Sequence, residues 1–145
     1  MSLVIDIADA VAAELNAAPA GTFNPAFTAV RRVLPEFDLT DLAELKVSVV
    51  PKSVVIAGST RATSQYEIAV DIGVQKKLGK DLDSEVAALS TLVDQIADYL
   101  RRRPLGAAPF ASWVSISNEP VYAPEHLAEQ RVFTSVLTVS YRALK

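Results

Sequence analysis

The sequence contains no cysteine, and this absence removes several kinds of chemistry at once. The chain can form no disulfide, offer no thiolate to a metal and present no thiol nucleophile. A lack of disulfides also fits a reducing compartment. Histidine is scarce too, since His126 is the only one. Zinc sites normally draw three or four ligands from histidine, cysteine and carboxylates, so the composition argues against such a site.

An excess of positive charge and long apolar runs are lacking as well. The net charge is −3 and the isoelectric point is near 5.1. A protein that binds nucleic acid mainly by electrostatics carries a basic face, which this balance disfavours. No apolar run approaches the ~18–20 residues that span a bilayer. Residues 1–18 also lack the positive region of a signal peptide. We expect a soluble intracellular protein.

The 145 residues, half of them apolar, predict one domain with its own core. Two amphipathic helices are expected, over residues 3–17 and about 82–102. In the first, Ser2 is a candidate N-cap. In the second, Asp83 or Ser84 is the candidate cap. Its buried stripe steps by three or four residues and consists of Val86, Leu89, Val93, Ile96 and Leu100.

The remaining apolar segments predict strands. The clearest is YEIAVDIGVQ, residues 66–75, whose apolar and polar residues alternate strictly, so one face is buried. An antiparallel hairpin is expected to join it to the preceding strand through a loop at 58–65. A short helical turn is expected at 38–45. The expected strands are residues 27–35 at a sheet edge, 46–51 with a short continuation at 53–58, 66–75, 113–117 and 131–142.

These elements predict an α+β fold. The strands cluster around one long helix and do not alternate with helices. We therefore expect a mostly antiparallel sheet with two helices packed on one face. No repeat or linker divides residues 1–145.

The segment PEHLAEQR, residues 124–131, holds the strongest candidate for a site. His126 lies beside Glu125 and three residues before Glu129, a spacing that places two side chains on one helical face. A metal or acid–base site would need further ligands, which the sequence does not supply. Pro124 followed by glutamate is typical of a short solvated turn. We therefore interpret the segment as a connecting turn that meets another subunit.

Two basic clusters flank the second helix. Lys76, Lys77 and Lys80 precede it, and Arg101, Arg102 and Arg103 follow it. Arginines at a helix C-terminus are favoured by the helix dipole, so they do not by themselves indicate a phosphate site. A helix of ~30 Å also separates the two clusters. An ion-pairing subunit surface is the favoured interpretation, and direct binding of nucleic acid is the alternative.

Catalytic signatures are absent from the sequence. It contains no dinucleotide-binding glycine pattern, phosphate loop, serine-nucleophile elbow or calcium loop. Asp94 and Asp98 are spaced as a solvated face of the second helix. We expect a protein without cofactor or metal that is not an enzyme.

Four stretches of the sequence are distinctive beyond their periodicity: VAAELNAA, VRRVLPEFDLTDLAELKVSVVPK, SQYEIAVDIGVQKK and PEHLAEQRVFTSVLTVSYR. They resemble proteins encoded in the tail-morphogenesis regions of bacteriophages and prophages. The size and order of elements are similar to the tail terminator, or tail completion, family.

The resemblance implies a structural virion protein, made in the host cytoplasm and located at the tail and neck. Such proteins form a hexameric ring on the head-proximal end of the tail tube, stop its polymerisation and present a surface for head joining. The implied partners are other copies of the chain, the major tail tube protein, a head-completion or neck protein and the tape measure protein. DNA would pass through the lumen without specific binding, and an acidic lumen would favour this passage.

The family has no catalytic residues to carry over. The candidate contacts to the ring or tube come from the loops and charged clusters of this chain: Arg61, Lys76, Lys77, Lys80, Arg101, Arg102, Arg103, Glu125, His126 and Glu129. Three alternatives stay open: a head-closure or neck adaptor protein, a tail-tube subunit, and a small α+β ligand-binding or regulatory domain.

Overall fold

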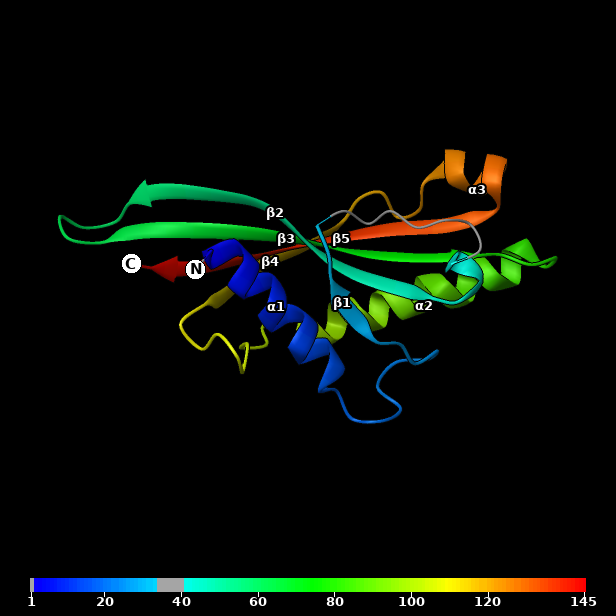
Figure 1. Cartoon of the computed structure of the whole chain (residues 1–145), viewed down its shortest axis with the longest axis horizontal. Helices are drawn as coiled ribbons and strands as arrows, with labels where there is room; N and C mark the ends of the chain where they lie inside the picture. Colours follow the sequence, from blue (N-terminus) through cyan, green and yellow to red (C-terminus); the bar gives the residue numbers. More distant parts are fainter. Residues whose placement is uncertain (1, 34–40) are drawn as a thin grey trace.

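The computed structural model describes residues 2–33 and 41–145 (Figure 1). Its helices are α1 (Leu3–Asn16), the 3-10 helix η1 (Asp41–Ala43), α2 (Leu82–Leu100) and α3 (Pro124–Gln130). Its strands are β1 (Ala29–Arg31), β2 (Lys46–Gly58), β3 (Ser64–Lys77), β4 (Ser112–Asn118) and β5 (Val132–Leu144). None of the described helices is long and apolar enough to cross a membrane.

The strands form one five-stranded sheet in the order β1-β2-β3-β5-β4. β1 runs parallel to β2, and every other neighbouring pair is antiparallel. The predicted α+β class and mostly antiparallel sheet are therefore confirmed, and the parallel β1 makes the sheet mixed. The predicted edge strand is confirmed at 29–31, while residues 34 and 35 of that prediction lie outside the described residues.

The core lies between the sheet and the two longer helices. On β3, Ile68, Val70, Ile72 and Val74 are fully buried, as their alternation predicts. We call this side the inner face of the sheet. The side chains of α1 and α2 that join the same core are Ile7, Val11, Leu15, Leu89, Val93, Ile96 and Leu100. The predicted stripe of α2 is confirmed, with Val86 partly buried at its start.

A third helix was not predicted. α3 lies on the side of the sheet away from α1 and α2 (Figure 1), which we call the outer face. Pro124 occupies the first turn, where its missing N–H leaves no bond unmade. The prediction of a connecting turn at 124–131 was wrong, because seven residues form a short helix that Arg131 ends in a left-handed conformation.

Local details differ at several other points. Asp81, not Asp83 or Ser84, caps α2, and its carboxylate accepts a 3.3 Å hydrogen bond from the Ser84 N–H. Ser2 precedes α1 but makes no side-chain cap. Segments 46–51 and 53–58 form a single strand that continues through a bulge. In the predicted helical turn, residues 38–40 lie outside the described residues and 41–43 form η1.

Candidate functional site

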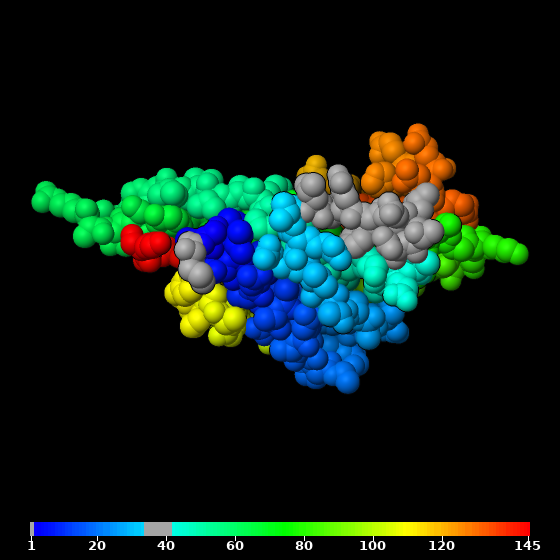
Figure 2. Space-filling model, in the orientation of Figure 1, coloured from blue at the N-terminus to red at the C-terminus, as the bar shows by residue number. Residues whose placement is uncertain are grey.

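The most unusual surface is the outer part of the β2–β3 hairpin, residues 52–67, which we call the hairpin arm. In Figures 1 and 2 it extends past α1 as the long projection at the left. Val54, Val55 and Ile56 are 39%, 60% and 59% exposed. Val54 and Ile56 are on the inner face, opposite Ile68 and Tyr66, yet both are left exposed. Three adjacent exposed apolar residues on a strand are typical of an interaction surface.

The backbone of the arm presents unpaired hydrogen-bonding groups. The N–H and C=O of Ser64 both bond to Lys145 on the β5 side, so they do not bond to Gly58 opposite. Because antiparallel ladders alternate, the backbone groups of Ile56 and Val54 also point away from β3. β1 reaches only as far as Val49 of β2. Beyond that point, no described segment pairs with β2 on the side opposite β3.

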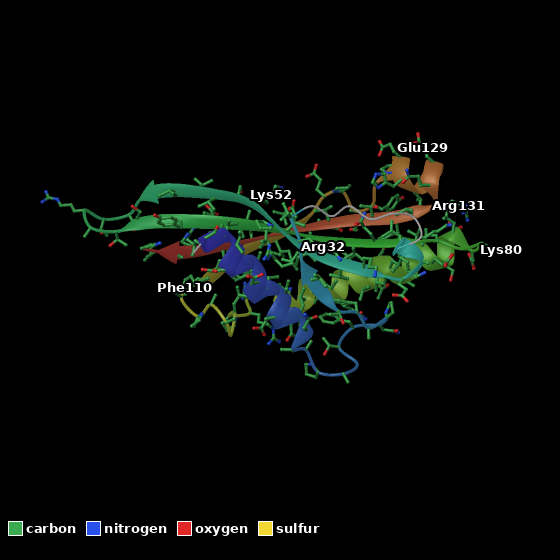
Figure 3. All side chains as sticks on the ribbon, viewed as in Figure 1. Arg32, Lys52, Lys80, Phe110, Glu129 and Arg131 are labelled. Carbon is green, nitrogen blue, oxygen red and sulfur yellow. The ribbon has the colours of Figure 1, made fainter. Side chains whose placement is uncertain are left out.

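Proline and a bulge interrupt this edge at its base. Pro51 occupies a position whose backbone points away from β3, so its missing N–H does not weaken the β2–β3 ladder. Lys52 is the extra residue of the bulge and lies 3.7 Å from Asp71 on the outer face (Figure 3). Proline, lysine and bulges discourage unwanted pairing of free edges. They protect the base of the arm, but residues 53–58, SVVIAG, carry no such residue.

The opposite border of the sheet is a second free edge. β4 pairs only with β5 among the described strands. The backbone of Val136 bonds toward the β4 side, to Glu119 and Pro120, and this sets the alternation along β5. By that alternation, Ser115 and Ser117 bond to β5, whereas the backbone groups of Ile116 point outward.

The two free edges lie at the same level of the sheet. One continuous row of paired residues runs from Val54 through Ile68 and Tyr141 to Trp113. A second row connects Pro51 with Ile116 through β3 and β5. Residues 50–55 of β2 and residues 112–117 of β4 are therefore opposite borders of the same strip of sheet.

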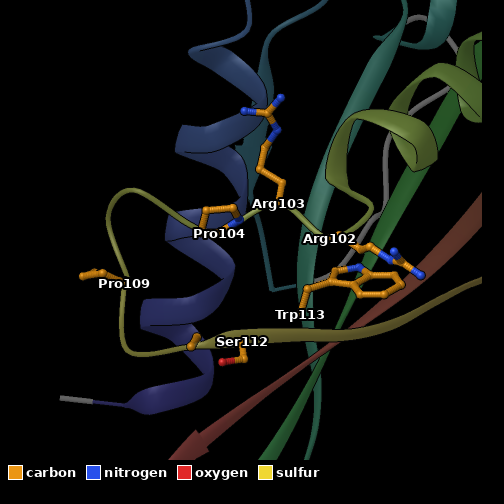
Figure 4. Close-up of a pocket in the computed structure, with 7 residues that line it drawn as sticks. Arg102, Arg103, Pro104, Pro109, Ser112 and Trp113 are labelled. Atoms are coloured by element: carbon orange, nitrogen blue, oxygen red, sulfur yellow. The ribbon is translucent and has the colours of Figure 1, made fainter.

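A hollow of about 320 Å³ lies beside the β4 edge (Figure 4). In the figure Arg102 extends beside the indole of Trp113 at the end of this strand. The indole N–H is buried and has no hydrogen-bond partner within the described part of the chain. The residues that line the hollow are Arg102, Arg103, Pro104, Pro109, Ala111, Ser112 and Trp113.

The structure does not gather His126 and its neighbouring glutamates into a metal site. All three side chains are exposed on α3, and His126 Nδ1 lies 2.9 Å from the hydroxyl of Thr134 on β5. No group of three or more potential metal ligands occurs among the described residues. The histidine therefore helps to hold α3 against the sheet.

The basic residues predicted as contacts lie at three separate places. Lys76, Lys77 and Lys80 lie at the end of the sheet that carries α3, because Lys77 is opposite Val132. Figure 3 shows Lys80 and Glu129 at this end. Arg131, which follows α3, connects this helix with the lysine segment by donating a 2.6 Å hydrogen bond to the carbonyl of Gly79. Arg61 is exposed in the turn of the hairpin arm.

The three arginines after α2 have different surroundings. Arg101 and Arg102 are exposed. Arg103 stacks 3.9 Å from the ring centre of Tyr99 and lies 3.7 Å from the Glu14 carboxylate. Arg103 therefore joins α2 to α1. The separation of the lysine and arginine clusters by α2 is confirmed, since 19 helical residues extend for about 28 Å.

The apolar arm was missed because the sequence interpretation looked for charged contacts. The sequence did contain a signal for this surface. In SVVIAG, Ser53 is the only polar residue, so both faces of this strand are largely apolar and at least one of them must be buried by another element or by a partner. Comparison of the chain with models of protein families and with curated proteins found no match.

Proposed function

We propose that this protein is a structural subunit of a tailed bacteriophage that forms a ring at the head-proximal end of the tail tube. In this role it ends polymerisation of the tube and provides the surface for head joining. Two likenesses support the location. Four stretches of the sequence resemble proteins from phage tail-morphogenesis regions, and the size and order of the elements are similar to the tail terminator family. The observation that carries the proposed self-assembly is the pair of free sheet edges on opposite sides of one molecule, one along β2 beyond its pairing with β1 and one along β4.

Two different surfaces on one chain suit a ring. A contact in which one face of a subunit meets a different face of the next is heterologous, and it closes into a ring when the rotation between copies permits. The apolar arm gives such a contact a hydrophobic component. The end with Lys76, Lys80 and α3 is then free to meet the tube or a neck protein, the other implied partners.

A head-closure or neck adaptor protein is the second candidate, because it also forms a ring. Deleting the gene and examining particles by electron microscopy distinguishes the two. Tails of uncontrolled length, corrected by supplying the gene again, support termination of the tube. Tails of normal length that remain unattached to heads indicate the adaptor. Normal virions would contradict both.

A further inference from the structure

We propose that the free edge of β2, residues 53–58, pairs antiparallel with β4 of a second copy, so that the sheet continues from subunit to subunit. This inference rests on the self-assembly proposed above, and it names the strands that form the contact. It assigns the apolar arm an occupant, namely the β4 edge of the neighbouring chain and the hollow beside it.

The direction of the strands permits this contact. β3 is antiparallel to β2, β5 to β3, and β4 to β5, so β2 and β4 of one chain run in opposite directions. A second copy placed beside β2 in the same orientation therefore presents β4 antiparallel to it. All copies keep α1 and α2 on the same side of the extended sheet, and no subunit has to turn over.

The hydrogen-bonding positions also match. On each free edge, two residues have backbone groups that point outward and side chains on the inner face. They are Val54 and Ile56 on β2, and Trp113 and Ile116 on β4. Residues paired by hydrogen bonds in an antiparallel ladder have side chains on the same face. Placing Ile56 opposite Trp113 brings Val54 opposite Ile116, with Val114 as the extra residue of the existing bulge.

The side chains of the two edges are compatible. On the inner face the exposed Val54 and Ile56 would meet Trp113, Ile116 and the hollow lined by Arg102. On the outer face Val55 would meet the serines of β4. Charge does not oppose the contact, because β4 has no charged residue and Lys52, at the base of the arm, already lies near Asp71.

Engineered cysteines test the contact directly, because the chain has none of its own. Val55 and the β4 residues Ser112, Ser115 and Ser117 are on the outer face at positions whose backbone points toward their own sheet. Opposed residues of this kind have Cα atoms about 4.5 Å apart, within the range of a disulfide. We would combine V55C with S112C, S115C or S117C, and oxidise both the concentrated protein and complemented phage lysates.

A disulfide-linked ladder of dimers and larger species from a double variant, with S115C the expected partner, supports the proposal. Single variants should form no disulfide-linked species after oxidation. An equal mixture of two single variants should form disulfide-linked dimers and nothing larger, because each chain then carries only one cysteine. The matched control is V55C combined with T91C on the exposed side of α2, which should give no ladder.

Two results would overturn the inference. Dimers from V55C alone would show that two β2 edges pair around a twofold axis. Double variants that restore normal tails but give no ladder in either sample would show that β4 is not the partner. The electron microscopy experiment remains separate: a ladder with normal virions upon gene deletion would retain the strand contact and reject the proposed phage role.

Discussion

At the scale of single residues, Tyr141 is notable because its hydroxyl is buried without a hydrogen-bond partner in the described chain. The residue is fully buried on β5, in the core. Burial raises the pKa of Tyr141 well above its usual range, and the nearby Glu14 carboxylate raises it further. A buried polar group without a partner costs stability.

We expect Tyr141→Phe to increase the free energy of unfolding by about 1 kcal/mol, because it removes only this hydroxyl. Above about pH 10 the unfolded tyrosine loses its proton before the folded one does, so the wild-type protein loses stability as pH rises. The variant should lack this part of the alkaline loss. Urea denaturation at pH 8 and pH 10.5 measures both effects. A less stable variant at pH 8 would show that the hydroxyl has a partner.

Asn16 holds the short strand β1 in place. Its side-chain amide donates to the Ala29 carbonyl at 2.9 Å and accepts from the Ala29 N–H at 2.8 Å. We expect Asn16→Ala to lower the free energy of unfolding by about 2 kcal/mol, since each lost bond contributes about 1 kcal/mol. Thr91→Ala, which removes only an exposed bond within α2, is the control and should change stability by less than about 0.5 kcal/mol. Equal effects in both variants would contradict this role.

At the scale of elements, β2 is one strand with two environments. Its first half is covered by β1 and the core, while its second half has β3 on one side and no described strand on the other. In the second half, the N–H and C=O groups of alternate residues therefore either bond to β3 or point to the side without a described strand. Proline, which has no N–H, can distinguish them.

We expect Ile56→Pro to leave the monomer folded, as Pro51 does at an equivalent position of the same strand. It removes a donor from the proposed contact and should weaken association between copies about tenfold. Val55→Pro is the matched variant, because it removes a donor to β3 and should destabilise the monomer. Thermal unfolding and cross-linking yield measure the two effects. A variant I56P that associates like the wild type would exclude pairing along this edge.

At the scale of the whole molecule, the hairpin arm differs from the compact part because its apolar residues Val54, Val55 and Ile56 lie outside the core. The two helices and the inner face of the sheet contain the core, while the arm extends past them (Figure 1). The contact proposed between copies uses the exposed apolar residues of this arm. Shortening the arm should separate folding from assembly.

We expect that replacing residues 56–66 by Asn-Gly, a favoured two-residue hairpin turn, gives a folded monomer that fails to restore tails in a deletion strain. The matched variant replaces only residues 58–64. It removes Arg61 and the turn but keeps Val54 to Ile56, and it should restore tails. Failure of both variants, with both folded, would show that the turn itself makes the essential contact.

Much of the fold follows from local patterns. Strict alternation along β3 and the stripe on α2 each bury one face, so both elements could be predicted from the sequence. Cap residues and α3 were harder, because Asp81, Asp83 and Ser84 are all suitable caps and the observed helix start decides between them. The charged candidate contacts could be named from the sequence, but their grouping in space depends on which strand ends lie together. Gly79 follows β3 and Arg131 precedes β5, and the two meet through a hydrogen bond.

The sequence by itself determined the α+β class, the two core helices and the buried face of the central strands, because these depend on the periodicity of apolar side chains. Only the tertiary structure decided that SVVIAG is uncovered and that its edge is level with β4. An apolar strand has the same local pattern in a core and at a free border. The lengths of the helices and the order of the strands determine which of the two it becomes.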